Sequence, residues 1–211
     1  MNKLDIAKIL LKTGCVSIKP NEPFTYASGL RGPIYCDNRV MLGHVAERYQ
    51  VCTSFVDVIN KNSFVYDHIG GLATAGIPHA AWIAHEMKRS MVYIRSKPKG
   101  HGKGNQIEGN FKEGDKILIV EDLVNQAKSL EEAVLGARSD GAAIEDCLCI
   151  VDYEMPAALD RVKKLGLRLF SLTDFSHIIK AGVELGFINE SDHETLNAWQ
   201  KDPVAWDKNL I

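Results

Sequence analysis

The chain has 211 residues, of which 45% are hydrophobic and 25% charged, and its formal net charge at pH 7 is −2. These values are typical of a soluble globular protein. No run of about eighteen apolar residues could span a membrane, and the charge gives no basic surface for nucleic acid. The five cysteines form neither a Cys-x-x-Cys pair nor an even disulfide set, so we expect a cytoplasmic protein with reduced thiols.

The first 40 residues are expected to form a small cap, or hood, over a larger core. Residues 3–13 have the apolar spacing of a short amphipathic helix. Through residues 16–37, aromatic and β-branched residues alternate with glycine and proline, which is typical of short antiparallel strands. Apolar residues then recur at helical spacing over 42–59, which predicts a helix.

Beyond this helix, strands and helices alternate, which predicts a mostly parallel central sheet flanked by helices. The expected elements are strands at 64–69, 91–94, 117–120, 142–151 and 167–172, and helices at 78–87, 129–138 and 156–165. Two more helices are expected at 174–186 and 190–200. We therefore divide the chain into a hood (1–40), an α/β core (41–175) and a helical tail packed on the core (176–211), which together form one structural unit.

Two acids follow the most hydrophobic of these strands. Ile117–Val120 is a continuous apolar run, typical of a strand buried on both faces of a parallel sheet, and Glu121 and Asp122 come next. Ser129 stands where it can cap the following helix. Ligands of open α/β sheets bind at this carboxyl edge. The acids are therefore candidates for binding hydroxyl groups, and the alternative is a solvated strand end.

Two further segments are suited to anions. The segment 95–106 carries five basic-type side chains and three glycines with almost nothing apolar, so we expect a mobile lid that covers a polyanion such as pyrophosphate. The alternative is a solvated basic loop. The glycine-rich turn 70–76 follows a strand and opens a helix, so its N–H groups could hold a phosphate. The histidines lack metal-ligand spacing, and no protein metal site is expected.

Over nearly its whole length the chain resembles the orotate phosphoribosyltransferases. Phe24–Gly29, with Gly32–Tyr35 after it, is similar to the hood and orotate-side segment, and Gly71–Pro78 to the pyrophosphate-side turn. The pattern Arg95-x-x-x-Lys99-x-His101-Gly102-x-Gly104 is similar to the catalytic lid, and Ile117–Ser129 to the phosphoribosyl pyrophosphate (PRPP) motif. The lid spacing is specific to orotate enzymes, whereas the acid pair is shared by the type I phosphoribosyltransferases, whose fold the resemblance implies.

The resemblance implies that orotate and PRPP are converted to orotidine 5′-monophosphate and pyrophosphate, in de novo pyrimidine (UMP) biosynthesis. Its implied catalytic residues are Arg95, Lys99 and His101, which would serve the leaving pyrophosphate, and Asp122. Mg²⁺ is the implied cofactor, held mainly by PRPP and reached through water by Glu121 and Asp122. The implied assembly is a homodimer whose lid is shared across subunits, with neither nucleic acid nor membrane as a partner.

The implied substrate-binding residues fall in three matched segments. They are Tyr26, Ser28, Gly29 and Tyr35 in the hood, Thr74 and Ala75 in the glycine turn, and Glu121, Asp122, Leu123, Val124, Asn125, Gln126, Ala127, Lys128 and Ser129 in the PRPP motif.

The loop Asn125–Ser129 departs from the family pattern. Family members usually have a small glycine-containing loop that surrounds the 5′-phosphate with backbone N–H groups. Here Ala127 and Lys128 replace residues that adopt positive φ easily, so we expect a poorly formed phosphate loop and weak PRPP binding. Two alternatives stay open for Lys128: its side chain supplies a point charge to the phosphate, or it blocks the pocket. One alternative is therefore a catalytically weakened or inactive relative that binds a nucleotide or a partner protein. A second alternative, transfer to a purine base, is disfavoured by the hood and the lid.

Overall fold

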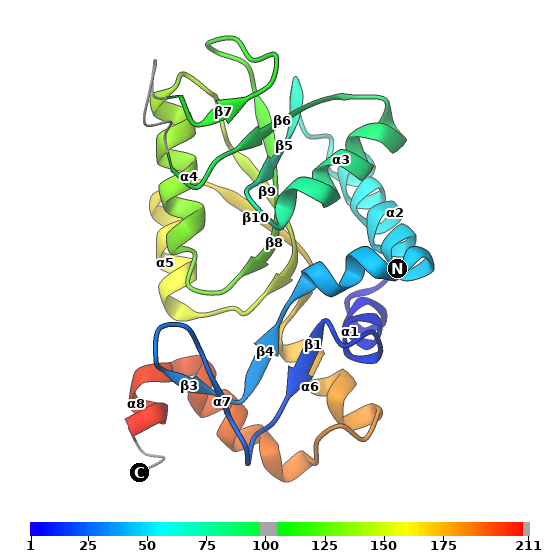
Figure 1. The fold of residues 1–211 in the computed structure, drawn as a ribbon, viewed down its shortest axis with the longest axis vertical. Helices are drawn as coiled ribbons and strands as arrows, with labels where there is room; N and C mark the ends of the chain where they lie inside the picture. The colour runs from blue at the N-terminus through cyan, green and yellow to red at the C-terminus, as the bar shows by residue number, and fades with distance from the viewer. Residues whose placement is uncertain (98–104, 209–211) are drawn as a thin grey trace.

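The computed structural model describes residues 1–97 and 105–208, and a six-stranded sheet forms its centre (Figure 1). Its strands are β5 (His68–Leu72), β6 (Ser90–Ile94), β7 (Ile107–Glu108), β8 (Ile117–Val124), β9 (Asp146–Asp152) and β10 (Arg168–Asp174). The order is β10-β9-β8-β5-β6-β7, and every pairing except that of β6 with β7 is parallel. The predicted α/β class with a mostly parallel sheet is confirmed.

Helices cover both faces of this sheet. α2 (Val45–Asn62) and α3 (Gly76–Met87) lie on one face, and α4 (Lys128–Ser139) and α5 (Pro156–Lys164) lie on the other (Figure 1). β8 is therefore enclosed, and Ile117–Val120 are almost fully buried, as a central parallel strand requires. Among the described residues, none of the helices has the length and hydrophobicity needed to cross a membrane.

The hood and the C-terminal helices form a lobe below the carboxyl edge of the sheet (Figure 1). Its elements are α1 (Lys3–Lys12), β1 (Val16–Ile18), β2 (Phe24–Thr25), β3 (Arg31–Gly32), β4 (Ile34–Cys36), η1 (Asn38–Gly43), α6 (Phe175–Glu184), η2 (Glu190–Asp192), α7 (His193–Lys201) and α8 (Pro203–Lys208). β1 pairs with β4 and β2 with β3, both antiparallel. Arg31 joins the two chain ends, because its Nε lies 2.6 Å from Asp207 Oδ1 and its Nη2 donates to Asp207 O at 3.0 Å.

The expected strand at 64–69 is wrong by several residues, because pairing with β8 begins only at His68. Gly70 and Gly71 consequently belong to buried β5 and not to the turn. Both are needed for packing: a Cβ on Gly70 would lie 2.4 Å from the Ile117 side chain, and one on Gly71 would lie 2.7 Å from the Ile77 backbone. The glycine turn is thus shorter than expected.

Two other expectations at the sheet edge are corrected. β8 extends to Val124, because its pairing with β9 continues to Asp152, so the two acids lie inside the strand and not after it. Ser129 does not cap α4, since the N-cap residue is Ala127 and it provides no side-chain hydrogen bond. β7 and α8 have no counterpart among the expected elements. The division into hood, core and tail stays a prediction.

Candidate active site

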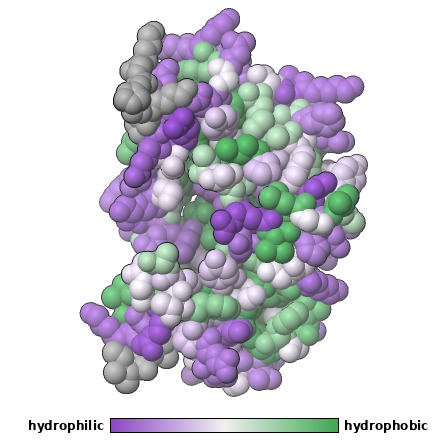
Figure 2. All heavy atoms as spheres, in the orientation of Figure 1, coloured by the Kyte–Doolittle hydropathy of each residue, from purple (hydrophilic) through white to green (hydrophobic). Residues whose placement is uncertain are grey.

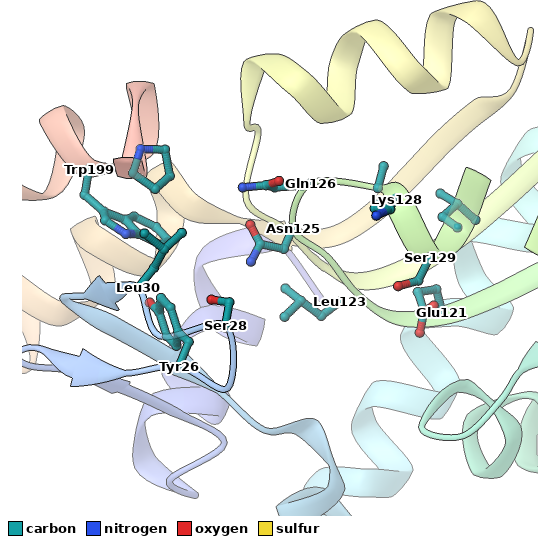
Figure 3. Close-up of a pocket in the computed structure, with 13 residues that line it drawn as sticks. Tyr26, Ser28, Leu30, Glu121, Leu123, Asn125, Gln126, Lys128, Ser129 and Trp199 are labelled. Carbon is teal, nitrogen blue, oxygen red and sulfur yellow. The ribbon is translucent and has the colours of Figure 1, made fainter. Parts of the chain in front are cut away.

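A cavity of about 380 Å³ lies between the carboxyl edge of the sheet and the lobe below it (Figure 3). It is lined from the hood by Tyr26, Ser28 and Leu30, from β8, its loop and α4 by Glu121, Leu123, Asn125, Gln126, Ala127, Lys128, Ser129 and Leu130, and from the C-terminal helices by Trp199 and Pro203. The structure thus brings the predicted hood and PRPP-motif residues to one space, at the sheet edge where α/β proteins bind ligands.

The two acids remain close together although only Glu121 lines the cavity. Glu121 Oε1 accepts a hydrogen bond from the backbone N–H of Asp122 at 2.7 Å. Burial, followed by the proximity of the Asp122 carboxylate, raises the pKa of Glu121 well above its ordinary value. Carboxyl groups so placed bind a proton, a cation or the hydroxyl groups of a ligand to relieve their repulsion.

The loop Asn125–Ser129 adopts a conformation that its sequence was expected to oppose. Ala127 has φ +56° and ψ +16°, in the left-handed region, where an L-residue is strained by about 1–2 kcal/mol. Its side chain is buried, and Arg161 Nη1 donates to Gln126 O at 2.8 Å beside it. These contacts hold the turn, so the expectation of a loop restricted by Ala127 is wrong.

The other predicted substrate-binding residues of the hood and the glycine turn do not line the cavity. Thr74 and Ala75 precede α3, and the next residue, Gly76, is packed so tightly on β8 that a Cβ would lie 2.3 Å from Val120 O. The turn is therefore beside the strand just before Glu121. Gly29 forms the turn between β2 and β3 with φ +85°, and Tyr35 is 43% exposed.

The described ends of the lid meet at the end of β6. Arg95 N–H donates to Gln106 O at 2.9 Å, and Arg95 Nη1 lies 3.3 Å from Glu108 Oε1. Gln106 is buried, and its N–H donates to Asp140 Oδ2 at 2.6 Å. Lys99 and His101, the other predicted lid residues, lie outside the described residues.

Comparison with known proteins gives the family. The chain is 41% identical to the orotate phosphoribosyltransferase of Coxiella burnetii over 202 residues, which are 96% of this chain and 97% of that protein. Its identity to the Enterococcus faecalis enzyme is 43% over 203 residues, with the same shares of each chain. The chain belongs to the orotate phosphoribosyltransferases. A scan against protein-family models gives no match.

Solved structures of the family share the fold. The orotate phosphoribosyltransferase of Aeropyrum pernix matches with a TM-score of 0.74 and 28% identity, over 87% of this chain and 99% of that one. The UMP synthase of Leishmania donovani matches with a TM-score of 0.79 and 27% identity, over 94% of this chain and 42% of that one. The chain thus has the type I phosphoribosyltransferase fold, as the sequence resemblance implied.

Sequence reasoning missed the wall that the C-terminal helices add to this orotate phosphoribosyltransferase cavity. Trp199 is almost fully buried and packs against Tyr153 and Phe175, with ring centroids 5.7 and 5.8 Å away. Pro203 begins α8 beside it. The tail was expected only as helices on the core, and no local pattern indicates that it returns to the hood.

Replacing Ala127 with glycine is expected to stabilise the protein by about 0.5–1 kcal/mol. The strain of the left-handed conformation is removed, and the greater freedom of unfolded glycine offsets part of this gain. Ala198→Gly is the control, because Ala198 is exposed within α7 and glycine there should cost about 1 kcal/mol. Urea denaturation measures the free energy of unfolding of both variants. An equal loss of stability in Ala127→Gly and Ala198→Gly would contradict the left-handed turn.

His79 is expected to make stability depend on pH. Burial lowers its pKa from 6.5 to about 4, although the nearby Asp122 carboxylate opposes the shift. Protonation therefore favours the unfolded state, so stability is full above pH 6.5 and falls as the pH drops toward 4. Between pH 7.5 and 4.5 wild type should lose about 2–3 kcal/mol more than His79→Phe, which keeps a ring against Trp82. If urea denaturation shows the same loss of stability in wild type and His79→Phe, His79 is not the source of the pH dependence.

Proposed function

We propose that this protein transfers the phosphoribosyl group of PRPP to orotate, giving orotidine 5′-monophosphate and pyrophosphate in pyrimidine biosynthesis. One observation carries the proposal: the cavity joins the acid pair, the start of α4 and the hood in a chain about as long as the orotate phosphoribosyltransferases it matches. We place the protein in the cytoplasm, because this compartment is reducing and all five cysteines are free thiols.

The cavity offers a different chemistry to each part of the substrates. The first N–H groups of α4 have no helical carbonyl partner and suit the 5′-phosphate, with the Ser129 hydroxyl beside them. Glu121 suits the ribose hydroxyls. Tyr26 and Ser28 line the cavity from the hood, across from Glu121 and Ser129, and suit the orotate ring (Figure 3). Burial raises the pKa of Tyr26, whose hydroxyl donates to Ile34 O and so fixes the hood.

The lid supplies what the leaving group needs. As N1 of orotate bonds to C1′ of the ribose, the bond from C1′ to the diphosphate oxygen breaks and pyrophosphate departs with the electron pair. Negative charge therefore grows on the leaving group, and nearby cations stabilise this transition state. We assign this role to Arg95, Lys99 and His101, and we place Asp122 at the reacting ribose.

We propose Mg²⁺ as the cofactor, carried mainly by PRPP. Within the described residues, no three His, Cys, Asp or Glu side chains are grouped to hold a metal ion. The close carboxyl groups of Glu121 and Asp122 nevertheless fit a hard cation approached through its water shell. When bound, the ion would neutralise charge on the diphosphate.

We propose a homodimer that forms through α2 and α3, with the lid shared across subunits. Val45 and Tyr49 are 66% and 59% exposed on α2, and they line a hollow of about 260 Å³ with Trp82 of α3. Hydrophobic residues are visible at the surface on the side that carries these helices (Figure 2). Exposed apolar patches of this kind mark protein interfaces.

Tyr49→Glu should convert the dimer to a monomer, because it places a charge in the centre of this apolar surface. Sedimentation velocity at micromolar concentration measures the change. Val65→Glu is the control, since Val65 is 70% exposed and lies beside Lys116 and Glu145, outside the hollow that Tyr49 lines. A Tyr49→Glu protein that sediments like wild type would place the interface elsewhere.

The activity assay follows orotate consumption with PRPP and Mg²⁺, and compares orotate with adenine and hypoxanthine as acceptors. We expect turnover with orotate alone, and its loss when the metal is chelated. Turnover of a purine base in place of orotate would overturn the proposal. Absence of turnover with every base would instead favour the non-catalytic binding protein.

Lys99→Ala should lower kcat about 10²-fold or more without unfolding the protein, because the lysine acts most strongly when charge develops on pyrophosphate. Lys97→Ala is the matched control, since it removes the same charge two residues away from an exposed position. Circular dichroism verifies the fold of both. Equal turnover in the two variants would remove Lys99 from the mechanism.

A further inference from the structure

Lys128 is the cation of the loop Asn125–Ser129, and the proposed reaction gives its side chain no role so far. It is the first residue of α4 and lines the cavity together with Gln126 and Ser129 (Figure 3). Of the 13 residues that line the cavity, Lys128 is the only cation and Glu121 of β8 the only carboxylic acid. Lys128 is exposed, and within the described residues its side chain makes no ion pair or hydrogen bond.

The nearest candidate partner of the Lys128 ammonium group on its own helix is already paired with another residue. Glu131 lies three residues further along α4, a spacing at which opposite charges on a helix attract. Its carboxylate is instead paired with Arg161, whose Nε lies 3.2 Å from Glu131 Oε2. The same guanidinium donates to Gln126 O at 2.8 Å. Arg161 therefore holds the loop and also prevents Glu131 from neutralising Lys128.

The position of Lys128 is unfavourable for the protein without a ligand. A cation at the first position of a helix is repelled by the positive end of the helix dipole and by the N–H groups that have no partner there. An anion bound at this helix end would reverse the sign of that interaction. A free lysine at this place is thus explained by a bound anion and not by the packing of α4.

We propose, on the basis of the proposed function, that the Lys128 ammonium group binds the 5′-phosphate of PRPP and determines the affinity for it. The left-handed turn at Ala127 starts α4 at Lys128, so the ammonium group, the Ser129 hydroxyl and the first N–H groups of the helix lie at one end of the cavity. A dianionic phosphate monoester is the ligand that matches this combination of one cation and several donors. Lys128 thereby adds a side-chain charge to a loop that lacks the usual glycines.

The test uses ribose 5-phosphate, which carries the phosphate monoester without the diphosphate. Calorimetric titration should show about tenfold weaker binding to Lys128→Ala than to wild type, because one charge-assisted hydrogen bond is lost. Lys128→Arg should bind within about threefold of wild type. Lys61→Ala is the matched control: it removes the same charge from an exposed position at the end of α2 and should bind like wild type.

Kinetic and stability measurements distinguish a Lys128 side chain that binds phosphate from one that only supports the fold. In Lys128→Ala the KM for PRPP should rise about tenfold and depend less on salt, while kcat and the KM for orotate stay within about twofold. Its melting temperature without ligand should equal or exceed that of wild type, because the repulsion at the helix end is removed.

Lys128→Ala that binds ribose 5-phosphate as well as wild type does, or more tightly, would overturn the assignment. So would a uniform loss of stability that accompanies weaker binding of both substrates. Because the titration needs no turnover, it tests Lys128 even if wild type fails to consume orotate, which would be a failure of the proposed function alone.

Discussion

The structure depends on the parallel pairing of β8 with a strand on each side. Hydrogen bonds to β5 and β9 fix its direction and register, and the helices on both faces bury its apolar half. The acid pair, the phosphate loop and the start of α4 all follow from the carboxyl end of this strand. A change in the register of β8 would therefore displace every cavity-lining group of this strand, its loop and α4.

In the loop after β8, two adjacent residues each have a locally unfavourable feature, one in its backbone conformation and one in the position of its charge. Ala127 adopts a conformation that suits glycine, and Lys128 places a positive charge at the positive end of a helix. Arg161 stabilises the turn at Ala127 through its hydrogen bond to Gln126 O, whereas its ion pair with Glu131 leaves the charge of Lys128 without a partner. Strain and unpaired charge at one place are expected where a ligand supplies the missing interaction. Under the proposed function, the loop is an altered phosphate site and not a lost one.

The cavity also depends on contacts between the two ends of the chain. The hood cannot be positioned by its short two-residue strands alone. The ion pair of Arg31 with Asp207 attaches it to α8, and the aromatic contacts of Trp199 anchor α7 beneath it. The cavity wall formed by Tyr26 and Ser28 is therefore supported by residues more than 170 positions away in the sequence.

Local sequence pattern determined the class of fold, the central strand and the family, because alternating strands and helices, a continuous apolar run and motif spacing are properties of neighbouring residues. The limits of β5 and β8 were decided by strand pairing, which involves residues far apart in the chain. Ala127 was judged by its intrinsic preference, and tertiary contacts with Arg161 overrode that preference. Trp199 and Pro203 entered the cavity wall only because the chain returns to the hood, and no short-range pattern encodes that approach.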